Sequence, residues 1–95
     1  MINVMIADDQ ELIRESLKIV LEMNEDMAVT AMARSGREAL ELLAQTPVDI
    51  ILMDIQMTHV DGMTAARAIR EVDQEVILVF ITSAAQFAIP GYQVG

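Results

Sequence analysis

The sequence predicts a doubly wound α/β fold, in which helices cover both faces of a parallel β-sheet. Short apolar segments alternate along the chain with longer amphipathic segments, which is the pattern of βαβ units. Segments 50–53 and 76–81 are apolar throughout, as is typical of strands buried on both faces. With 95 residues, 54% of them hydrophobic, the chain has the length and the apolar content of one domain.

The first half of the chain is predicted to contain two strands and two helices. Residues 2–7 form a buried strand, and residues 10–23 form a helix whose inner face carries Ile13, Leu17, Val20 and Leu21. Residues 27–33 form a second strand, and Thr30 in its middle indicates an edge position. Residues 36–45 form a helix with Ala39, Leu40 and Leu43 facing inward.

The second half repeats the pattern. Residues 49–53 form a third strand, residues 62–72 a helix with Met63, Ala66 and Ile69 inward, and residues 76–81 a fourth strand that is apolar on both faces. A further helix is expected from Ala84, interrupted at Pro90.

Composition excludes several classes of protein. The net charge is −9, from 15 acidic and 6 basic side chains, so this chain itself is not expected to bind nucleic acid. No apolar run reaches the roughly 20 residues that span a membrane, and no signal peptide is evident. The sequence has no cysteine, which fits a cytoplasmic protein without disulfides or thiolate metal sites.

Polar side chains follow three of the predicted strands. Asp8 and Asp9 follow the first strand, Asp54 ends the third, and Thr82 follows the fourth. Ligands of doubly wound sheets bind beyond the carboxyl ends of the strands, so these side chains are expected to converge. Three neighbouring carboxylates repel one another unless a cation lies among them, and Mg²⁺ prefers oxygen ligands of this kind. A carboxylate beside such an ion can also attack a phosphoryl group.

Each residue also has a structural interpretation. Asp8 or Asp9 could cap the following helix, and Asp8 could form a capping box with Glu11. Thr82 could cap the next helix. Asp54 alone would be read as a turn residue. His59 is expected to be solvated in a polar loop. The eight methionines are expected to fill the core.

These residues resemble the receiver domain of two-component response regulators. The features that match are the Asp8-Asp9 pair after an apolar strand, the segment DIILMDIQM, the Asp61-Gly62 pair, and VILVFITSA with its Thr82. The resemblance covers essentially all of residues 1–95. It implies the flavodoxin-like strand order 2-1-3-4-5, with the fifth strand, the fifth helix and the output domain missing from this chain.

The resemblance also implies a role for each site residue. Asp54 would accept a phosphoryl group from a sensor histidine kinase. Asp9, helped by Asp8, would hold Mg²⁺ together with Asp54 and the main-chain carbonyl of Gln56. Thr82 would contact the phosphoryl oxygens and switch the surface that the domain offers to partners, and DNA would be bound through the absent output domain. The first half resembles regulators with helix-turn-helix output domains, whereas the last residues resemble those with LytTR-type output.

Two departures from the family pattern bear on these expectations. Thr58 stands where the family often has proline. The family lysine at the end of the fifth strand is absent, and Lys18, the only lysine, lies in a predicted helix. We therefore expect weak phosphorylation, and either a fragment of a longer chain or self-association through the exposed edge of the fourth strand.

Other classes of function are less well supported. A Mg²⁺-dependent phosphohydrolase of the haloacid dehalogenase type would have an acidic residue two positions after Asp54, where Gln56 stands. A flavin- or nucleotide-binding module would have a glycine- or hydroxyl-rich loop in place of Asp8 and Asp9. A receiver fragment that is not efficiently phosphorylated remains the principal alternative. An enzyme acting on a separate substrate is not expected.

Overall fold

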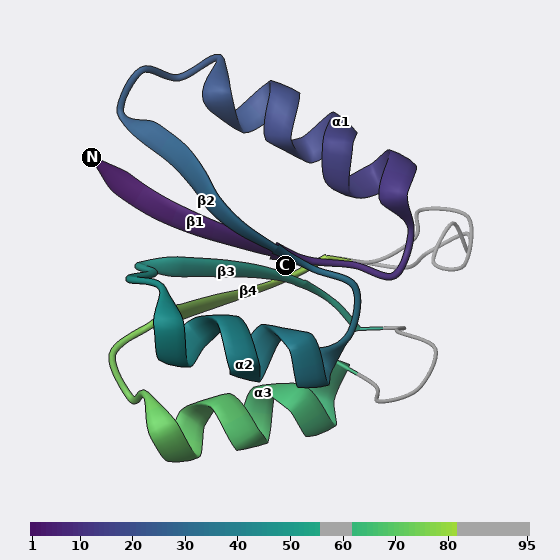
Figure 1. The fold of residues 1–95 in the computed structure, drawn as a ribbon, viewed down its shortest axis with the longest axis vertical. Coiled ribbons are helices and arrows are strands. Elements are labelled where there is room, and N and C mark those ends of the chain that lie inside the picture. Colours follow the sequence, from purple (N-terminus) through teal and green to yellow (C-terminus); the bar gives the residue numbers. More distant parts are fainter. Residues whose placement is uncertain (56–61, 82–95) are drawn as a thin grey trace, which may run out of the picture.

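Four parallel strands form one sheet in the order β2-β1-β3-β4, with helices on both faces (Figure 1). This computed structural model describes residues 1–55 and 62–81. The elements are β1 (Ile2–Ala7), α1 (Glu11–Glu22), β2 (Met27–Ala33), α2 (Gly36–Gln45), β3 (Ile50–Asp54), α3 (Gly62–Val72) and β4 (Ile77–Ile81).

The doubly wound order predicted from the sequence is confirmed. The chain moves from β1 outward to β2, then crosses β1 to form β3 and β4 on its other side. The order therefore reverses between β1 and β3, which are direct neighbours. The predicted bounds agree with the structure within one residue at each end, and the helix expected from Ala84 lies outside the described residues.

The main core lies between the sheet and helices α2 and α3. Met5 and Ala7 of β1 and Ile51 and Met53 of β3 point to this side and are buried. Ile69 of α3 packs against the same cluster and is fully buried. The expectation that methionine fills the core is confirmed for Met5 and Met53, because unbranched side chains adapt to the gaps between strands. It is wrong for Met1 and Met23, which are 81% and 79% exposed.

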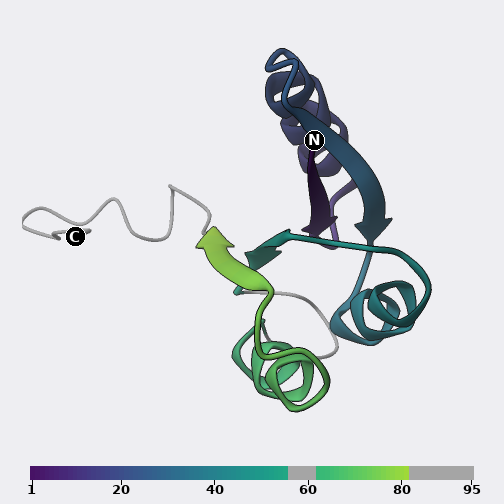
Figure 2. The same cartoon turned by 90° about the vertical axis from the view of Figure 1, so that its left-hand side faces the viewer.

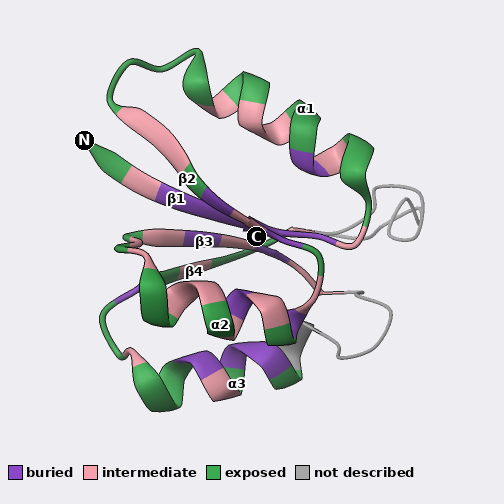
Figure 3. Ribbon diagram, viewed as in Figure 1, coloured by how far each residue is buried: buried purple, intermediate pink, exposed green. Residues whose placement is uncertain are grey.

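Helix α1 covers only part of the opposite face. It lies over β1 and β2, whereas β4 lies at the far end of the sheet from it (Figure 2). The inner position predicted for Val20 is therefore wrong, since its side chain is exposed. Ile77 and Val79 of β4 are 56% and 41% exposed (Figure 3). Strand β4 is therefore apolar on both faces, but among the described residues it is not buried on both faces.

The edge position predicted for strand β2 is confirmed. β2 pairs with β1 alone among the described strands, and Thr30 is exposed. The pairing of β1 with β2 shifts register after Val4, so that Val4 lies opposite Val29 and Met5 opposite Ala31. Thr30 is the extra residue of this bulge, which is a common feature of edge strands.

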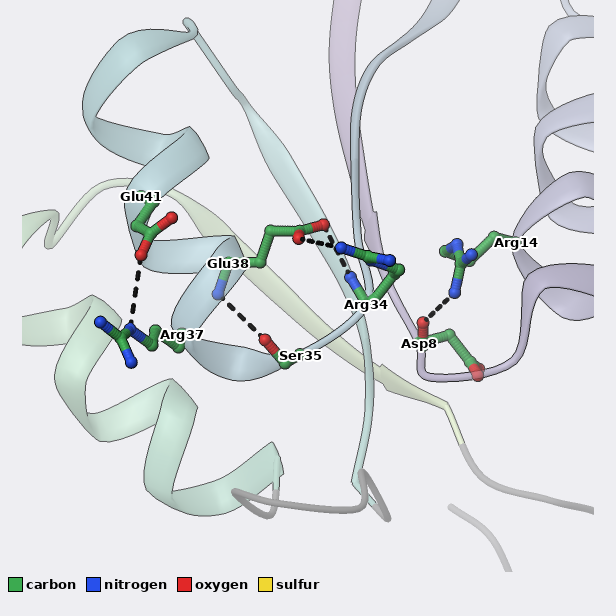
Figure 4. Close-up of polar contacts among 7 residues, drawn as sticks. All are labelled: Asp8, Arg14, Arg34, Ser35, Arg37, Glu38 and Glu41. Carbon is green, nitrogen blue, oxygen red and sulfur yellow. Dashed lines mark hydrogen bonds and ion pairs between the residues drawn. The ribbon is translucent and has the colours of Figure 1, made fainter.

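The turn from β2 into α2 is fixed by the N-cap Ser35 and by a contact from Glu38 back to the residue before the cap. The Ser35 hydroxyl accepts a hydrogen bond from the Glu38 amide at 3.1 Å, and the Glu38 carboxylate accepts one from the Arg34 amide at 3.1 Å. Figure 4 shows these side chains together with the ion pair of Arg37 and Glu41. Such reciprocal contacts satisfy amides that have no partner within the helix.

Two substitutions in α3 test the position of the core. We expect Ile69→Ala to lower the free energy of unfolding by about 2 to 5 kcal/mol, because it leaves a cavity at a fully buried position. Val72→Ala in the same helix removes a side chain that is 70% exposed, and should change stability by less than about 0.5 kcal/mol. Urea unfolding followed by circular dichroism measures both. Equal losses in the two variants would contradict the described core.

Candidate functional site

The carboxyl ends of β1 and β3 bring three aspartates together. Ala7 is paired with Met53, so the residues that follow them lie side by side at one edge of the sheet. Asp8 and Asp9 continue from β1, and Asp54 is the last residue of β3. Each offers a carboxylate oxygen, and the three oxygens lie within 4.8 Å of one another. Residues 45 positions apart in sequence are thus joined in one acidic cluster, defined as Asp8, Asp9 and Asp54.

Asp8 is held at three points. Its amide donates to the Ala33 carbonyl at 3.0 Å, which extends the pairing of β1 with β2 by one residue. Its carboxylate Oδ1 accepts from the Gln10 amide at 2.9 Å. Its own carbonyl oxygen accepts from Nη1 of Arg14 at 2.8 Å (Figure 4). The residue is only 2% exposed, so these contacts leave it little freedom.

Burial of the Asp8 side chain raises the pKa of its carboxyl above the ordinary value of 3.8. The hydrogen bond from Gln10 opposes this change by stabilising the charged form. The negative charges of Asp54 and Asp9 add to the increase. Burial and the two neighbouring carboxylates thus penalise the charged form of Asp8, and a cation bound beside it would offset this penalty.

The donor set fits a divalent cation that prefers oxygen. Carboxylate oxygens are hard ligands, and their separation in the cluster allows one ion to contact more than one of them. The sequence offers no cysteine and a single histidine, so the ligands differ from the nitrogen and sulfur sets typical of zinc. A carboxylate next to such an ion is also a competent nucleophile toward phosphorus.

The structure places some of the predicted site residues and leaves others undescribed. Asp8, Asp9 and Asp54 come together as the alternation of strands and helices predicted. Thr82 and Gln56 lie outside the described residues, as does His59.

The capping box predicted for Asp8 and Glu11 is wrong. Gln10 is the N-cap of α1, and no side chain caps this end of the helix. Asp8 accepts from the amide of the N-cap residue itself, two positions along, because β1 continues through Asp8 before the chain turns. The result is an Asx turn, in which the carboxylate stabilises the connection between β1 and α1.

Arg14 was not predicted from the sequence to lie near the site. It is the only buried basic side chain among the described residues, at 9% exposed. Its spacing of three and seven residues from Leu17 and Leu21, both assigned to the inner face, was a signal that its side chain lies on that face.

The fold and the acidic cluster define a class of doubly wound α/β proteins that bind a cation at the carboxyl edge of the sheet. Residues 4–95 match the family described as "Response regulator receiver domain". The chain belongs to this family, and the resemblance drawn from the sequence is confirmed.

Similar proteins agree with this assignment. The uncharacterized transcriptional regulatory protein YxjL of Bacillus subtilis is 38% identical over 82 residues, which is 86% of this chain and 38% of that protein. The response regulator domain of Thermotoga maritima CheB has a TM-score of 0.82 at 28% identity, over 97% of this chain and 66% of the other.

A third comparison includes a bound metal. The response regulator TrrA of Thermotoga maritima, solved in complex with Mg²⁺-BeF, has a TM-score of 0.81 at 28% identity, over 92% of this chain and 74% of that chain. The chain spans 19% to 44% of the length of the first curated relatives that it matches. Within the described residues, none of the helices has the length and apolarity to cross a membrane.

Substituting Asp8 tests the electrostatics of the cluster. Because its pKa is raised on folding, the charged form is penalised in the folded protein. This penalty is absent well below pH 3.8, grows as the pH rises toward the folded-state pKa, and is constant above it. We therefore expect Asp8→Asn to raise the free energy of unfolding at pH 7 in metal-free buffer. This gain should vanish well below pH 3.8, where Asp8 is uncharged in both states.

Thermal unfolding measured across this pH range, with Asp26→Asn as the control, checks the expectation. Asp26 is exposed and precedes β2, so its substitution should produce no comparable gain. A loss of stability in Asp8→Asn at pH 7 without metal would show that the hydrogen bonds of the carboxylate outweigh its repulsion.

Proposed function

We propose that this chain is a phosphorylation-dependent signalling receiver that accepts a phosphoryl group on Asp54 from a sensor histidine kinase. The observation that carries the proposal is the convergence of three carboxylate oxygens within 4.8 Å, at the carboxyl edge of a sheet that belongs to the receiver family. Asp9, Asp54 and the main-chain carbonyl of Gln56 would hold Mg²⁺, with Asp8 assisting. Thr82 contacts the phosphoryl oxygens and acts as the switch residue.

Asp54 is suited to the role of nucleophile by its position. It ends β3 next to the central strand, so its carboxylate belongs to the rigid part of the fold. A carboxylate oxygen of Asp54 attacks phosphorus, the bond from phosphorus to the donor breaks, and an aspartyl phosphate is formed. When Mg²⁺ is bound, it neutralises charge on the transferring oxygens. Burial, together with repulsion from Asp54 and Asp9, raises the pKa of Asp8, and a cation bound at the cluster would relieve this penalty.

Phosphorylation changes the charge at the edge of the sheet, and we propose that this change is read by an output domain. YxjL, a relative that shares 38% identity, is named a transcriptional regulatory protein. In the same way, this chain would control transcription through DNA binding by an output domain, of the helix-turn-helix or LytTR type. The net charge of −9 supports the view that DNA is not contacted by this chain itself.

The proposed phosphoryl transfer modifies Asp54 of the chain itself and not a separate substrate. Transfer to Asp54 and later hydrolysis of the aspartyl phosphate are both reactions of the domain on itself. The absence of cysteine from the sequence supports action in the reducing cytoplasm.

Beryllofluoride binding tests the proposal directly. We expect Mg²⁺ to shift the amide resonances of residues in the acidic cluster, and beryllofluoride to produce a second change only when Mg²⁺ is present. Asp54→Asn should abolish the second change, because the carboxylate that binds the phosphoryl analogue is lost. Asp26→Asn, which removes an equal charge at an exposed position, should respond as the unmodified chain does.

The same samples also test metal dependence. Chelation by EDTA is expected to reverse both spectral changes. A beryllofluoride response in Asp54→Asn of the same size as in the unmodified chain would contradict Asp54 as phosphoacceptor. Loss of every response in the unmodified chain would favour the alternative of a receiver fragment that is not efficiently phosphorylated.

We also propose that the chain self-associates through the edge of β4. In the described part of the chain β4 pairs with β3 alone, and its Ile77, Val79 and Phe80 are all more than a third exposed. An unpaired strand edge with apolar side chains is a template for pairing with a second chain. Association by this route would form a homodimer or a higher oligomer.

Sedimentation equilibrium measures this association. Val79→Lys is expected to weaken it by at least about tenfold, because it places a charge on the edge strand. Val72→Lys makes the same change at the exposed end of α3 and should leave association unaltered. A stable monomer at high protein concentration in the unmodified chain would refute the proposal.

A further inference from the structure

Arg14 is a buried cation directly beside the acidic cluster, and the proposed chemistry leaves it without a role. It lies in the first turn of α1 and is 9% exposed. Burial of a guanidinium is costly unless the group is hydrogen-bonded, so a buried arginine in a small domain calls for a specific reason. Two other arginines, Arg34 and Arg37, form ion pairs with Glu38 and Glu41 of α2, as Figure 4 shows.

The contact of Arg14 is with the main chain of Asp8 and not with its carboxylate. Nη1 of Arg14 donates to the Asp8 carbonyl oxygen at 2.8 Å. In Figure 4 the Asp8 side chain points away from the guanidinium, toward the edge of the sheet. Arginine therefore acts here as a hydrogen-bond donor that carries a charge, which makes the hydrogen bond stronger than one between neutral groups.

The carbonyl that Arg14 holds is part of the Asp8–Asp9 peptide group. The peptide is planar, so fixing its oxygen also fixes the amide and the Cα of Asp9. The preceding peptide is already fixed, because the Asp8 amide donates to the Ala33 carbonyl. Arg14 supplies the second restraint, after the point where pairing of β1 with β2 ends. Its side chain runs back toward the N-terminal end of α1, as helical side chains do.

We propose that Arg14 is a positioning residue for the acidic cluster: by holding the Asp8–Asp9 peptide, it orients the Asp9 carboxylate toward Asp54 and so sets the affinity for Mg²⁺. This inference rests on the proposed function, because it concerns the metal site that the receiver uses. Removing a group that orients a metal ligand without itself binding the metal typically lowers metal affinity by about 10 to 100-fold.

Mg²⁺ affinity, measured by calorimetry and by amide shifts, tests the inference without any phosphorylation assay. Arg14→Met keeps an apolar stem but removes the donor, and is expected to weaken Mg²⁺ binding by at least about tenfold. Arg14→Lys keeps the charge and a donor, and is expected to recover binding to within about threefold of the unmodified chain. Arg37→Met removes the same charge at an exposed site and should leave affinity within about twofold.

A spectroscopic measurement separates positioning from general loss of structure. In metal-free protein, Arg14→Met should shift the Asp9 amide resonance more than the Asp54 amide, because only the former shares the peptide that Arg14 holds. Urea unfolding of each variant establishes that affinities are compared on folded protein. If Arg14→Met does not fold, Arg14→Gln replaces it, since its amide is too short to make the same contact.

The outcomes distinguish this inference from the proposed function. Mg²⁺ affinity of Arg14→Met within twofold of the unmodified chain would overturn the positioning role and leave the receiver function standing. An equal loss in Arg37→Met would overturn it as well, by showing that net charge alone matters. Failure of the unmodified chain to bind Mg²⁺ would instead refute the proposed function, and the inference with it.

Discussion

β1 and β3 pair in parallel with Ala7 opposite Met53, and this register determines where the acidic residues of the site lie. Both strands are buried by α2 and α3 through alternate residues, Met5 and Ala7 on one strand and Ile51 and Met53 on the other. A shift of one residue would turn these side chains to the opposite face, so the core specifies the register strongly. The acidic cluster is thus positioned by apolar contacts, although burial and the neighbouring charges penalise the charged form of Asp8.

The cluster illustrates how a functional site can cost stability. Asp8 is almost fully buried, and its raised pKa reflects both burial and two neighbouring negative charges. The Gln10 amide holds the Asp8 carboxylate in place by a hydrogen bond. Hydrogen bonds with Ala33 and Arg14 hold the main chain of Asp8. Local restraint of this kind holds charged groups close together in a folded protein that is only marginally stable.

The two faces of the sheet differ in coverage. Helices α2 and α3 lie against one face and bury the main core (Figure 3). On the other face α1 covers β1 and β2, while Ile77 and Val79 of β4 are exposed in the described chain. The acidic cluster lies at the ends of β1 and β3, each of which is paired with a strand on both sides. The exposed apolar side chains of β4 are where the proposed self-association can be tested.

The sequence by itself determined the element order, the approximate bounds and the three carboxylates, because strand ends and apolar periodicity are local features. It could not determine the contacts of Asp8, since a capping box and an Asx turn require the same residue type at nearly the same position. The exposure of Val20 and the burial of Arg14 were decided only by tertiary structure. Both depend on how far α1 extends across the sheet, which is a packing property that helical periodicity alone does not encode.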